Sequence, residues 1–338
     1  MVSKYNLFGN KFRKDALIVE INILKCHGTG NDFILIDEYN NNYNFNDEIR
    51  RSIAIQACNR AKFIGGDGIL FVQKSNICDA KMRIFNADGS EAEMCGNGLR
   101  CVGRYVIEML KKEKVEIETL KARYWVNAQD DIYEGVKTVK IDIKSVSLNV
   151  NSLPLNYTKE KLLFDKIPQL SNEFDFTAVS ITNPHLVSIV SSIDTDKLVK
   201  LGEKANATKE VLPQGVNVSF VRVIEDNNIY VKTYERGVGL TKSCGTAMTA
   251  SSIVSCISEK VKFDKIINVY NDGGAIKTIV HNSDEDYWVE FIGNATFVFE
   301  GTMELDGGRI DQFTIDESKF ESEANAYEEF FQYTRKII

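Results

Sequence analysis

The sequence contains the stretch Met82-Arg-Ile-Phe-Asn-Ala-Asp-Gly-Ser-Glu-Ala-Glu-Met-Cys-Gly-Asn-Gly98, and its layout returns as Val231-Lys-Thr-Tyr-Glu235 followed by Cys244-Gly-Thr246. In both places a strand-like run closes with a polar residue nine positions before a cysteine, and a helical pattern follows the cysteine. The two cysteines are 149 residues apart in a chain of 338 residues. Such internal self-similarity indicates a duplicated structural unit. We therefore predict two similar domains with one equivalent site in each.

Polar turns upstream of the two cysteines extend the repeat. Gly28-Thr-Gly-Asn31 places Asn31 64 residues before Cys95, and Asn183-Pro-His185 places Asn183 61 residues before Cys244. Short runs that alternate apolar and polar residues dominate the chain and are typical of half-buried strands. They include 33–37, 69–72, 81–85, 139–143 and 229–234, whereas helical patterns are fewer, at 47–58, 99–112 and 247–257. This balance predicts an α+β fold with a majority of strands.

The two ends of the chain do not fit the repeat. The apolar run 16–24 is interrupted by Glu20 and Asn22, and we interpret it as a strand. Near the other end, Ser318 and Glu321 have the spacing of a capping box, which marks the start of a helix. One face of that predicted helix carries apolar side chains at helical spacing: Phe320, Ala324, Tyr327 and Phe331. We expect this helix to dock on the body of the protein or on a neighbouring subunit.

Composition excludes several classes of protein. The net charge is −7 with no basic stripe, which argues against nucleic-acid binding. No apolar run reaches the roughly 18 residues that a membrane-spanning helix needs. The seven cysteines are an odd number in a chain without a secretory signal, so we expect a cytoplasmic protein with free cysteines. No Cys-x-x-Cys or His-x-x-x-His pair indicates a metal, and no lysine motif indicates pyridoxal phosphate, so no metal and no cofactor is expected.

Each repeated cysteine is followed by small residues and then by a helix, which places its sulfur at a helix N-terminus. Free backbone N–H groups and the positive end of the helix dipole lie there. They lower the pKa of a thiol and offer a site for a carboxylate. If both helix starts face one pocket, a substrate carboxylate would lie between them and its α-carbon would lie between the sulfurs of Cys95 and Cys244. One thiolate could then remove the α-proton while the other thiol delivers a proton to the opposite face.

These blocks resemble the signature blocks of the diaminopimelate epimerase family, in that family's order. The resemblance rests on Lys25-Cys-His-Gly-Thr-Gly-Asn-Asp-Phe33, the stretch 82–98, Asn183-Pro-His185, Glu235-Arg-Gly-Val-Gly239 and Cys244-Gly-Thr246, and it covers roughly residues 22–305. It implies two pseudo-symmetric domains, each a mostly antiparallel sheet wrapped around a central helix. It also implies epimerisation of LL-diaminopimelate to meso-diaminopimelate, in lysine and peptidoglycan biosynthesis, without a cofactor.

On that resemblance we place the N-terminal domain at 22–146 with a return strand at 298–306, the C-terminal domain at 147–297, and terminal extensions at 1–21 and 309–338. The resemblance implies that Cys95 and Cys244 are the acid–base pair and that His185 and Glu235 assist the thiols and the substrate amino group. It implies that the substrate-binding residues are Asn31, Asn86, Gly96, Asn97, Asn183, Asn217, Arg236, Gly245 and Thr246. Among these, Asn86, Asn183, Asn217 and Arg236 would hold the distal, non-reacting end of the amino acid.

Several positions depart from the family pattern. Thr182, Leu240 and Ala247 stand where the family usually has glycine, glutamate and glycine. Ala247 lies at the second helix start, so the departures bear on the substrate more than on the reaction type. Two alternatives therefore stay open: a racemase of another amino acid on the same fold, and a module that binds an amino acid without turnover. The expected partner is a small-molecule amino-acid substrate, with neither nucleic acid nor membrane, and a homodimer is kept open.

Overall fold

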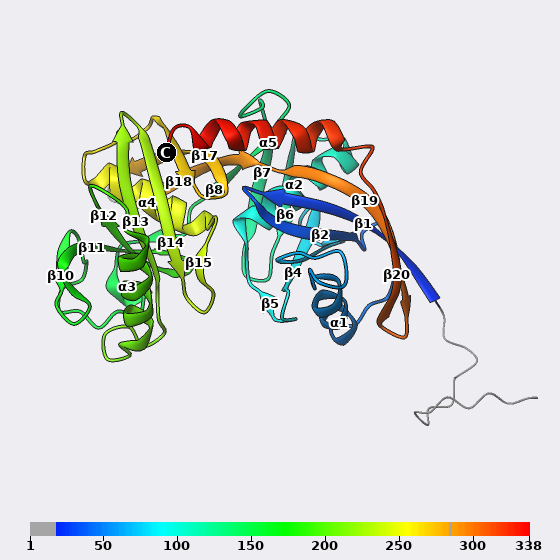
Figure 1. The fold of residues 1–338 in the computed structure, drawn as a ribbon, viewed down its shortest axis with the longest axis horizontal. Coiled ribbons are helices and arrows are strands. Elements are labelled where there is room, and N and C mark those ends of the chain that lie inside the picture. The colour runs from blue at the N-terminus through cyan, green and yellow to red at the C-terminus, as the bar shows by residue number, and fades with distance from the viewer. Residues whose placement is uncertain (1–17, 284–285) are drawn as a thin grey trace, which may run out of the picture.

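The computed structural model describes residues 18–283 and 286–338, and it has an α+β fold with two lobes side by side (Figure 1). Each lobe wraps its strands around one central helix. The N-terminal lobe surrounds α2 (Gly96–Leu110), and the C-terminal lobe surrounds α4 (Gly245–Ile257). The predicted pair of similar halves, each with a helix directly after its cysteine, is confirmed.

The strands of the two lobes follow the same order. The N-terminal lobe contains β1 (Ile18–Gly28), β2 (Asn31–Asp37), β3 (Gly68–Gln73), β4 (Ala80–Asn86), β5 (Glu91–Ala92), β6 (Lys114–Glu118), β7 (Arg123–Gln129) and β8 (Thr138–Ile143), with α1 (Asp47–Ala57) between β2 and β3. The C-terminal lobe contains β11 (Ser171–Ile181), β12 (Pro184–Ile189), β13 (Asn217–Glu225), β14 (Asn228–Glu235), β15 (Gly239–Thr241), β16 (Ile266–Asn271), β17 (Gly274–Ser283) and β18 (Asp286–Asn294), with α3 (Thr195–Ala207) between β12 and β13.

Strand pairing demonstrates the duplication independently of the cysteines. The parallel pairs β2–β3 and β4–β6 of the first lobe correspond to the parallel pairs β12–β13 and β14–β16 of the second. The remaining named pairs are antiparallel, and β8 pairs with β18 to join the lobes.

The other elements are β9 (Val146–Ser147), β10 (Asp165–Ile167), the short 3₁₀ helix η1 (Val150–Ser152), β19 (Thr296–Asp306), β20 (Arg309–Asp316) and α5 (Glu321–Arg335). Because β19 pairs with β1 along most of its length, the chain returns to the first lobe. The domain limits themselves stay predictions.

The two central helices are buried on nearly all sides, and their residues suit that position. In α4 the hydroxyls of Thr249, Ser252 and Ser255 donate to backbone carbonyls four residues earlier, so these buried polar groups are satisfied within the helix. In α2, Gly103 lies against Val126 of β7 so closely that a Cβ atom at this position would overlap the valine methyl groups. The sheet can therefore approach α2 only because residue 103 has no side chain.

Replacing Gly103 by alanine is expected to destabilise the protein by about 1–3 kcal/mol, because the added methyl must displace Val126 in a packed core. Urea unfolding followed by circular dichroism would measure the loss. The matched control is Gly96→Ala at the start of the same helix, where a Cβ atom would meet nothing within 4 Å. Equal stability of the G103A and wild-type proteins would contradict the packing argument.

Helix α5 lies across the junction of the two lobes (Figure 1). Its Glu323 forms an ion pair with Arg104 of α2, and its Tyr327 hydroxyl donates to the carbonyl of Gly273 at 2.7 Å. The capping-box prediction for this helix is wrong. The N-cap is Phe320 without a side-chain cap, and the Ser318 hydroxyl donates to Asp316 at 2.6 Å instead.

The sequence predicted most elements, with differences at their ends. Residues 16 and 17 of the predicted strand 16–24 lie outside the described residues, and the strand runs on to Gly28. The buried face of α5 carries Tyr327, Phe330 and Thr334, so the buried phenylalanine is Phe330 whereas Phe331 is half-buried. Helix α3 was not predicted. Among the described residues, no helix has the length and apolar character needed to cross a membrane.

Candidate active site

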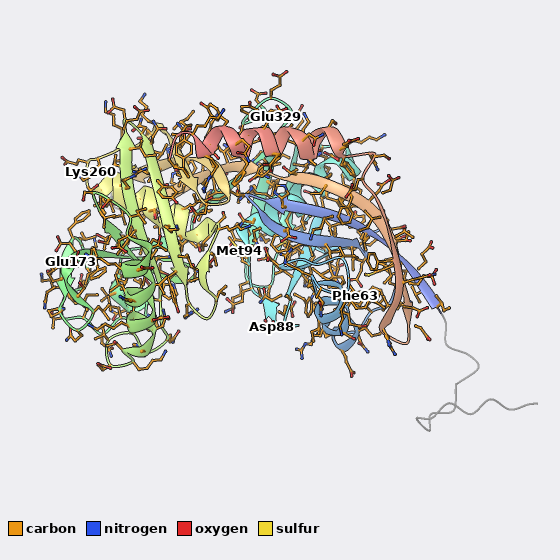
Figure 2. The ribbon with its side chains drawn as sticks, in the orientation of Figure 1. Phe63, Asp88, Met94, Glu173, Lys260 and Glu329 are labelled. Atoms are coloured by element: carbon orange, nitrogen blue, oxygen red, sulfur yellow. The ribbon has the colours of Figure 1, made fainter. Side chains whose placement is uncertain are left out.

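Cys95 and Cys244 occupy equivalent positions at the starts of the two central helices. Each is the N-cap residue, with extended φ and ψ of −141° and 117° for Cys95 and −126° and 111° for Cys244. Neither side chain caps its helix, so both sulfurs are available for other contacts. Figure 2 labels Met94, the neighbour of Cys95, on the side of the N-terminal lobe that faces the other lobe.

The first turns of the two helices meet. A Cβ atom at Gly245, the first residue of α4, would lie 3.8 Å from Oδ1 of Asn97 in the first turn of α2 and 3.5 Å from the ring of Phe291. The absence of a side chain at Gly245 and at Gly96 leaves the backbone N–H groups of both helix starts uncovered. Two positive helix ends therefore converge on one place, which favours an anion such as a carboxylate.

The surroundings of Cys95 are built by β2. Asn31 begins that strand, and its Oδ1 lies 3.6 Å from the Cys95 sulfur and accepts a hydrogen bond from Nδ2 of Asn97 at 3.1 Å. The Nδ2 of Asn31 donates to Oδ2 of Asp67 at 2.6 Å. The structure thus brings together three of the residues that the sequence singled out, namely Asn31, Cys95 and Asn97.

A second series of polar contacts surrounds Cys244. Its sulfur lies 3.5 Å from Oγ1 of Thr246, which accepts from Nδ2 of Asn183 at 3.2 Å. Oδ1 of Asn183 lies 2.9 Å from Nε2 of His185. Glu235, at the end of β14, accepts from the Thr241 hydroxyl at 2.6 Å. Asn183, His185 and Thr246 therefore lie together with Cys244 at the start of α4.

Burial raises the pKa of both thiols. The pKa of Cys95 is raised to about 11, chiefly because the thiolate would lose its water, while the N–H groups of Gly98 and Asn97 act in the opposite direction. The pKa of Cys244 is raised well above its usual range, first by burial and then by the negative charge of Glu235, which also raises the pKa of Cys95. The Glu235 side chain thus contacts Cys244, and its charge also acts on Cys95.

The sequence predicted that the helix starts lower the pKa of both thiols, and this prediction is wrong, because the net shift in the free protein is upward. The N–H groups do act to lower the pKa, but desolvation of the thiolate outweighs them.

Alkylation of Cys95 by iodoacetamide is expected to rise about tenfold per pH unit between pH 7 and 10 and to level off near pH 11. The thiolate is the reactive form, and its fraction grows tenfold per unit below the pKa. Mass spectrometry of the Cys95 peptide at a series of pH values would measure the rate. A plateau already at pH 8 would show that the helix N-terminus outweighs burial.

His185 is fully buried, and its pKa is lowered to about 3 by burial and, to a smaller extent, by the charge of Arg236. It is therefore neutral at pH 7. Because Nδ2 of Asn183 already donates to Thr246, Oδ1 of Asn183 is the acceptor and Nε2 of His185 carries the proton. Its Nδ1 has no hydrogen-bond partner among the described residues and is a free acceptor at the site.

The residues expected to hold the distal end of a substrate are only partly brought together. Oδ1 of Asn217 accepts from the backbone N–H of Arg236 at 2.8 Å, and the exposed Arg236 guanidinium donates to the carbonyl of Gln214 at 2.8 Å. Asn86 donates to Ser90 of its own turn at 2.9 Å. Among the described residues, no hydrogen bond links Asn86 to the other predicted site residues.

Sequence reasoning missed two residues that act on the surroundings of Cys95. One is Asp67, the partner of Asn31. The other is Arg100, which is fully buried and donates to Oγ1 of Thr29 and to the carbonyl of Asn294, both at 2.8 Å. Burial lowers the pKa of Arg100 to about 10, and its positive charge acts to lower the pKa of Cys95. Its position five residues after the cysteine was the available signal, but an arginine in a helix is usually a surface residue.

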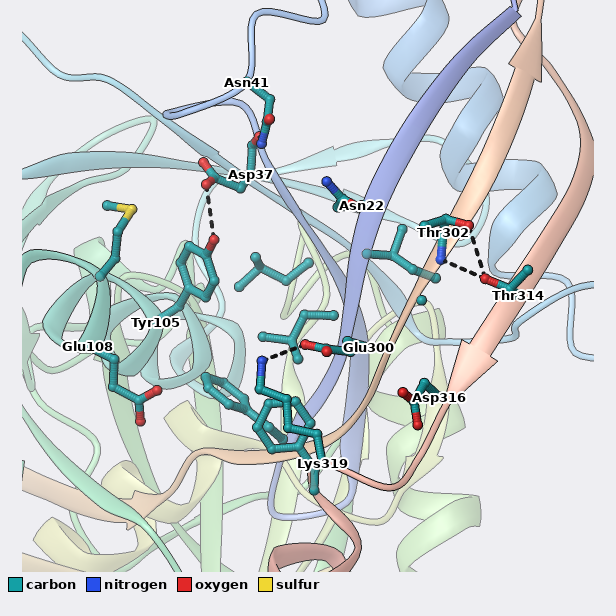
Figure 3. Close-up of a pocket in the computed structure, with 17 residues that line it drawn as sticks. Asn22, Asp37, Asn41, Tyr105, Glu108, Glu300, Thr302, Thr314, Asp316 and Lys319 are labelled. Atoms are coloured by element: carbon teal, nitrogen blue, oxygen red, sulfur yellow. Dashed lines mark hydrogen bonds and ion pairs between the residues drawn. The ribbon is translucent and has the colours of Figure 1, made fainter.

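A hollow of about 740 Å³ lies elsewhere, beside α2, β1, β19 and β20 (Figure 3). None of the predicted site residues lines it. Its charged groups already have partners: Lys319 pairs with Glu300 at 2.6 Å, and Tyr105 donates to Asp37 at 3.0 Å. We assign it no role.

The family model and the relatives that match this chain in sequence name the same family. The family model described as "Diaminopimelate epimerase" matches residues 23–143 and 177–298. A diaminopimelate epimerase of Clostridium acetobutylicum is 82% identical over 325 residues, covering 96% of this chain and 98% of the relative. One of Ligilactobacillus salivarius is 40% identical over 323 residues, covering 91% and 98%.

Solved structures with low sequence identity share the fold. A phenazine biosynthesis protein of Bacillus anthracis has a TM-score of 0.62 at 15% identity, covering 85% of this chain and 99% of that one. A hydroxyproline epimerase of Agrobacterium vitis has a TM-score of 0.56 at 15% identity, covering 86% and 94%. Together with the matches in sequence, the two equivalent cysteine-led helices place this chain in the diaminopimelate epimerase family.

Proposed function

We propose that this chain converts LL-diaminopimelate to meso-diaminopimelate by a two-base reaction at Cys95 and Cys244, without a cofactor, in lysine and peptidoglycan biosynthesis. The observation that carries the proposal is the meeting of two helix starts, each with a cysteine at its N-cap and both under the influence of Glu235. Membership of the family supports the substrate.

In the proposed reaction the α-carboxylate lies between the helix starts and accepts hydrogen bonds from their N–H groups. One cysteine, as thiolate, takes the α-proton and becomes a thiol. The other, as thiol, gives its proton to the opposite face of the carbon and becomes a thiolate. No net proton is gained or lost, and the stereocentre is inverted. After product leaves, the sulfurs have exchanged their protonation states.

The raised pKa of each thiol suits this task because a thiolate with a high pKa is a strong base. The α-proton of an amino acid is nevertheless far less acidic than a thiol, so negative charge growing on the carboxylate must be stabilised. Backbone N–H donors aimed at such charge contribute about 2.7–4 kcal/mol each in comparable oxyanion sites. Gly96, Asn97, Gly245 and Thr246 would supply these donors at the two helix starts.

The remaining roles are those that the resemblance implies, and the contacts around the two cysteines support several of them. His185 is neutral, with Nδ1 free to accept a hydrogen bond, and the charge of Glu235 acts on both sulfurs, so these two would assist the thiols and the substrate amino group. Asn31 would act beside the reacting centre. The exposed guanidinium of Arg236 would bind the distal carboxylate with two parallel hydrogen bonds, assisted by Asn86, Asn183 and Asn217. The two alternatives, a racemase of another amino acid and a non-catalytic binding module, are not favoured, because the 82% identical relative is a diaminopimelate epimerase.

A cytoplasmic location and a homodimer are also proposals. All seven cysteines are free thiols, as a reducing compartment would keep them. Strand β20 pairs only with β19 among the described strands, and its Ile315 is 45% exposed, so this edge is where a second subunit would be expected. Sedimentation velocity tests the dimer.

The test of the function is incubation with LL-diaminopimelate in the presence of a reductant, followed by chromatographic separation of the LL and meso forms. The proposal expects the meso form to accumulate until both forms reach equilibrium. A folded, reduced protein that leaves the LL form unchanged would contradict it. A parallel panel of shorter L-amino acids, followed by optical rotation, should remain unchanged.

A further inference from the structure

Asp67 connects a charged cluster to the environment of Cys95. It lies in the loop just before β3, and its Oδ2 accepts from Nδ2 of Asn31 at 2.6 Å and from the backbone N–H of Asp32 at 3.1 Å. Its Oδ1 accepts from Nη2 of Arg60 at 2.9 Å. Arg60 also pairs with Asp32, which in turn pairs with Lys25, and both contacts measure 2.5 Å. The carboxylate of Asp67 is thus held in place from two sides.

This arrangement determines which way the amide of Asn31 faces. An ionised carboxylate can only accept hydrogen bonds, so the Nδ2 of Asn31 must point to Asp67. The oxygen Oδ1 then points to Cys95, with the sulfur at 3.6 Å, and also accepts from Asn97 at 3.1 Å. If the Asn31 amide were flipped, its Nδ2 would face Nδ2 of Asn97, so two donors would meet. Its Oδ1 would then face the carboxylate of Asp67, so two acceptors would meet.

We propose that Asp67 is a positioning residue, which locks the Asn31 amide with its oxygen toward Cys95 and so holds the proton on that sulfur. The inference rests on the proposed function, because it concerns the protonation of one of the two reacting thiols. An acceptor next to the sulfur stabilises S–H, whereas a freely turning amide could offer its N–H group and stabilise the thiolate. Without Asp67, Cys95 would therefore become a weaker base and a stronger acid.

The other charged groups that face Cys95 come from different elements. Glu235 at the end of β14 acts to raise the pKa of Cys95, and Arg100 of α2 acts to lower it. Glu235 raises the pKa of Cys244 as well. A reversible two-base reaction works best when the two sulfurs hold a proton about equally tightly. The Asn31 oxygen adds proton affinity at Cys95, as the Glu235 contact does at Cys244.

The test is the pH dependence of Cys95 alkylation in three variants, read from the Cys95 peptide by mass spectrometry. In Asp67→Ala the midpoint is expected to fall by about one pH unit, which makes alkylation about tenfold faster at a fixed pH below the midpoint. Asp67→Asn retains an acceptor for Asn31 and is expected to keep most of the wild-type midpoint. The matched control is Arg60→Met. It removes the ion pairs of Arg60 with Asp32 and Asp67 but leaves the hydrogen bond between Asp67 and Asn31.

The proposal is overturned if folded D67A protein keeps the wild-type midpoint, or if R60M shifts the midpoint as far as D67A does. If D67A does not fold, Asn31→Ala carries the test, because it removes the acceptor itself; an unchanged midpoint in N31A overturns the proposal. Labelling needs no substrate. A wild-type protein that epimerises, with an unshifted D67A midpoint, refutes this inference alone, whereas a wild-type protein that does not epimerise refutes the proposed function.

Discussion

Replacing either Cys95 or Cys244 by serine is expected to lower kcat/KM for LL-diaminopimelate by about 10³-fold or more. A hydroxyl does not ionise in the range where a thiol does, so the variant loses either its base or its acid, and positioned proton transfer contributes about 10²–10⁴-fold. Both single variants should be affected, because inversion needs one group on each face of the carbon. Initial rates of meso formation measure the loss.

The control for this prediction is Cys78→Ser. Cys78 is a partly exposed free cysteine in the loop before β4, where its backbone N–H binds the Ser75 hydroxyl at 3.0 Å. This substitution changes a thiol outside the proposed site and should leave the rate within a factor of two. Activity of C95S or C244S within tenfold of wild type would remove the basis of the two-base proposal.

Replacing Arg236 by methionine is expected to lower kcat/KM for diaminopimelate by about 100-fold, mostly through a higher KM. The proposed contact is a charge-assisted pair with the distal carboxylate, and hydrogen bonds to charged groups contribute about 1.5–3 kcal/mol each. Methionine keeps the volume and removes the charge. Steady-state kinetics separates the two parameters.

Arg123→Met on β7 is the matched control, since Arg123 is likewise exposed but lies outside the proposed site. The pH profile of Cys95 alkylation should be nearly the same in R236M as in wild type, because Arg236 acts on the distal end of the substrate. A loss confined to kcat, with KM unchanged, would argue that Arg236 serves the chemistry instead of binding.

The duplicated architecture could be predicted because its signal is redundant along the chain. Two cysteines, each followed by glycine and each nine positions after a strand-closing polar residue, mark the same place in both lobes. The structure confirms this in the order of strands and in the location of the parallel pairs. Local patterns were sufficient here because each unit repeats its own strand, turn and helix.

What depends on tertiary contacts could not be predicted. Ser318 has the right spacing for a cap, but Asp316 offers its hydroxyl a nearer partner, and the helix starts later. The sign of the thiol pKa shift depends on burial, which the helix N-terminus alone does not reveal. Asp67 is 36 residues from Asn31, and only the parallel pairing of β2 with β3 brings them together.

The most direct test of the two-sulfur reaction is epimerisation by the wild-type protein in deuterated water, stopped at low conversion. If different groups remove and deliver the proton, the meso product carries solvent deuterium at the inverted carbon, while recovered LL substrate carries almost none. Deuterium entering recovered substrate as fast as product would mean that a single base serves both faces, and the account given for Cys95 and Cys244 would then be wrong.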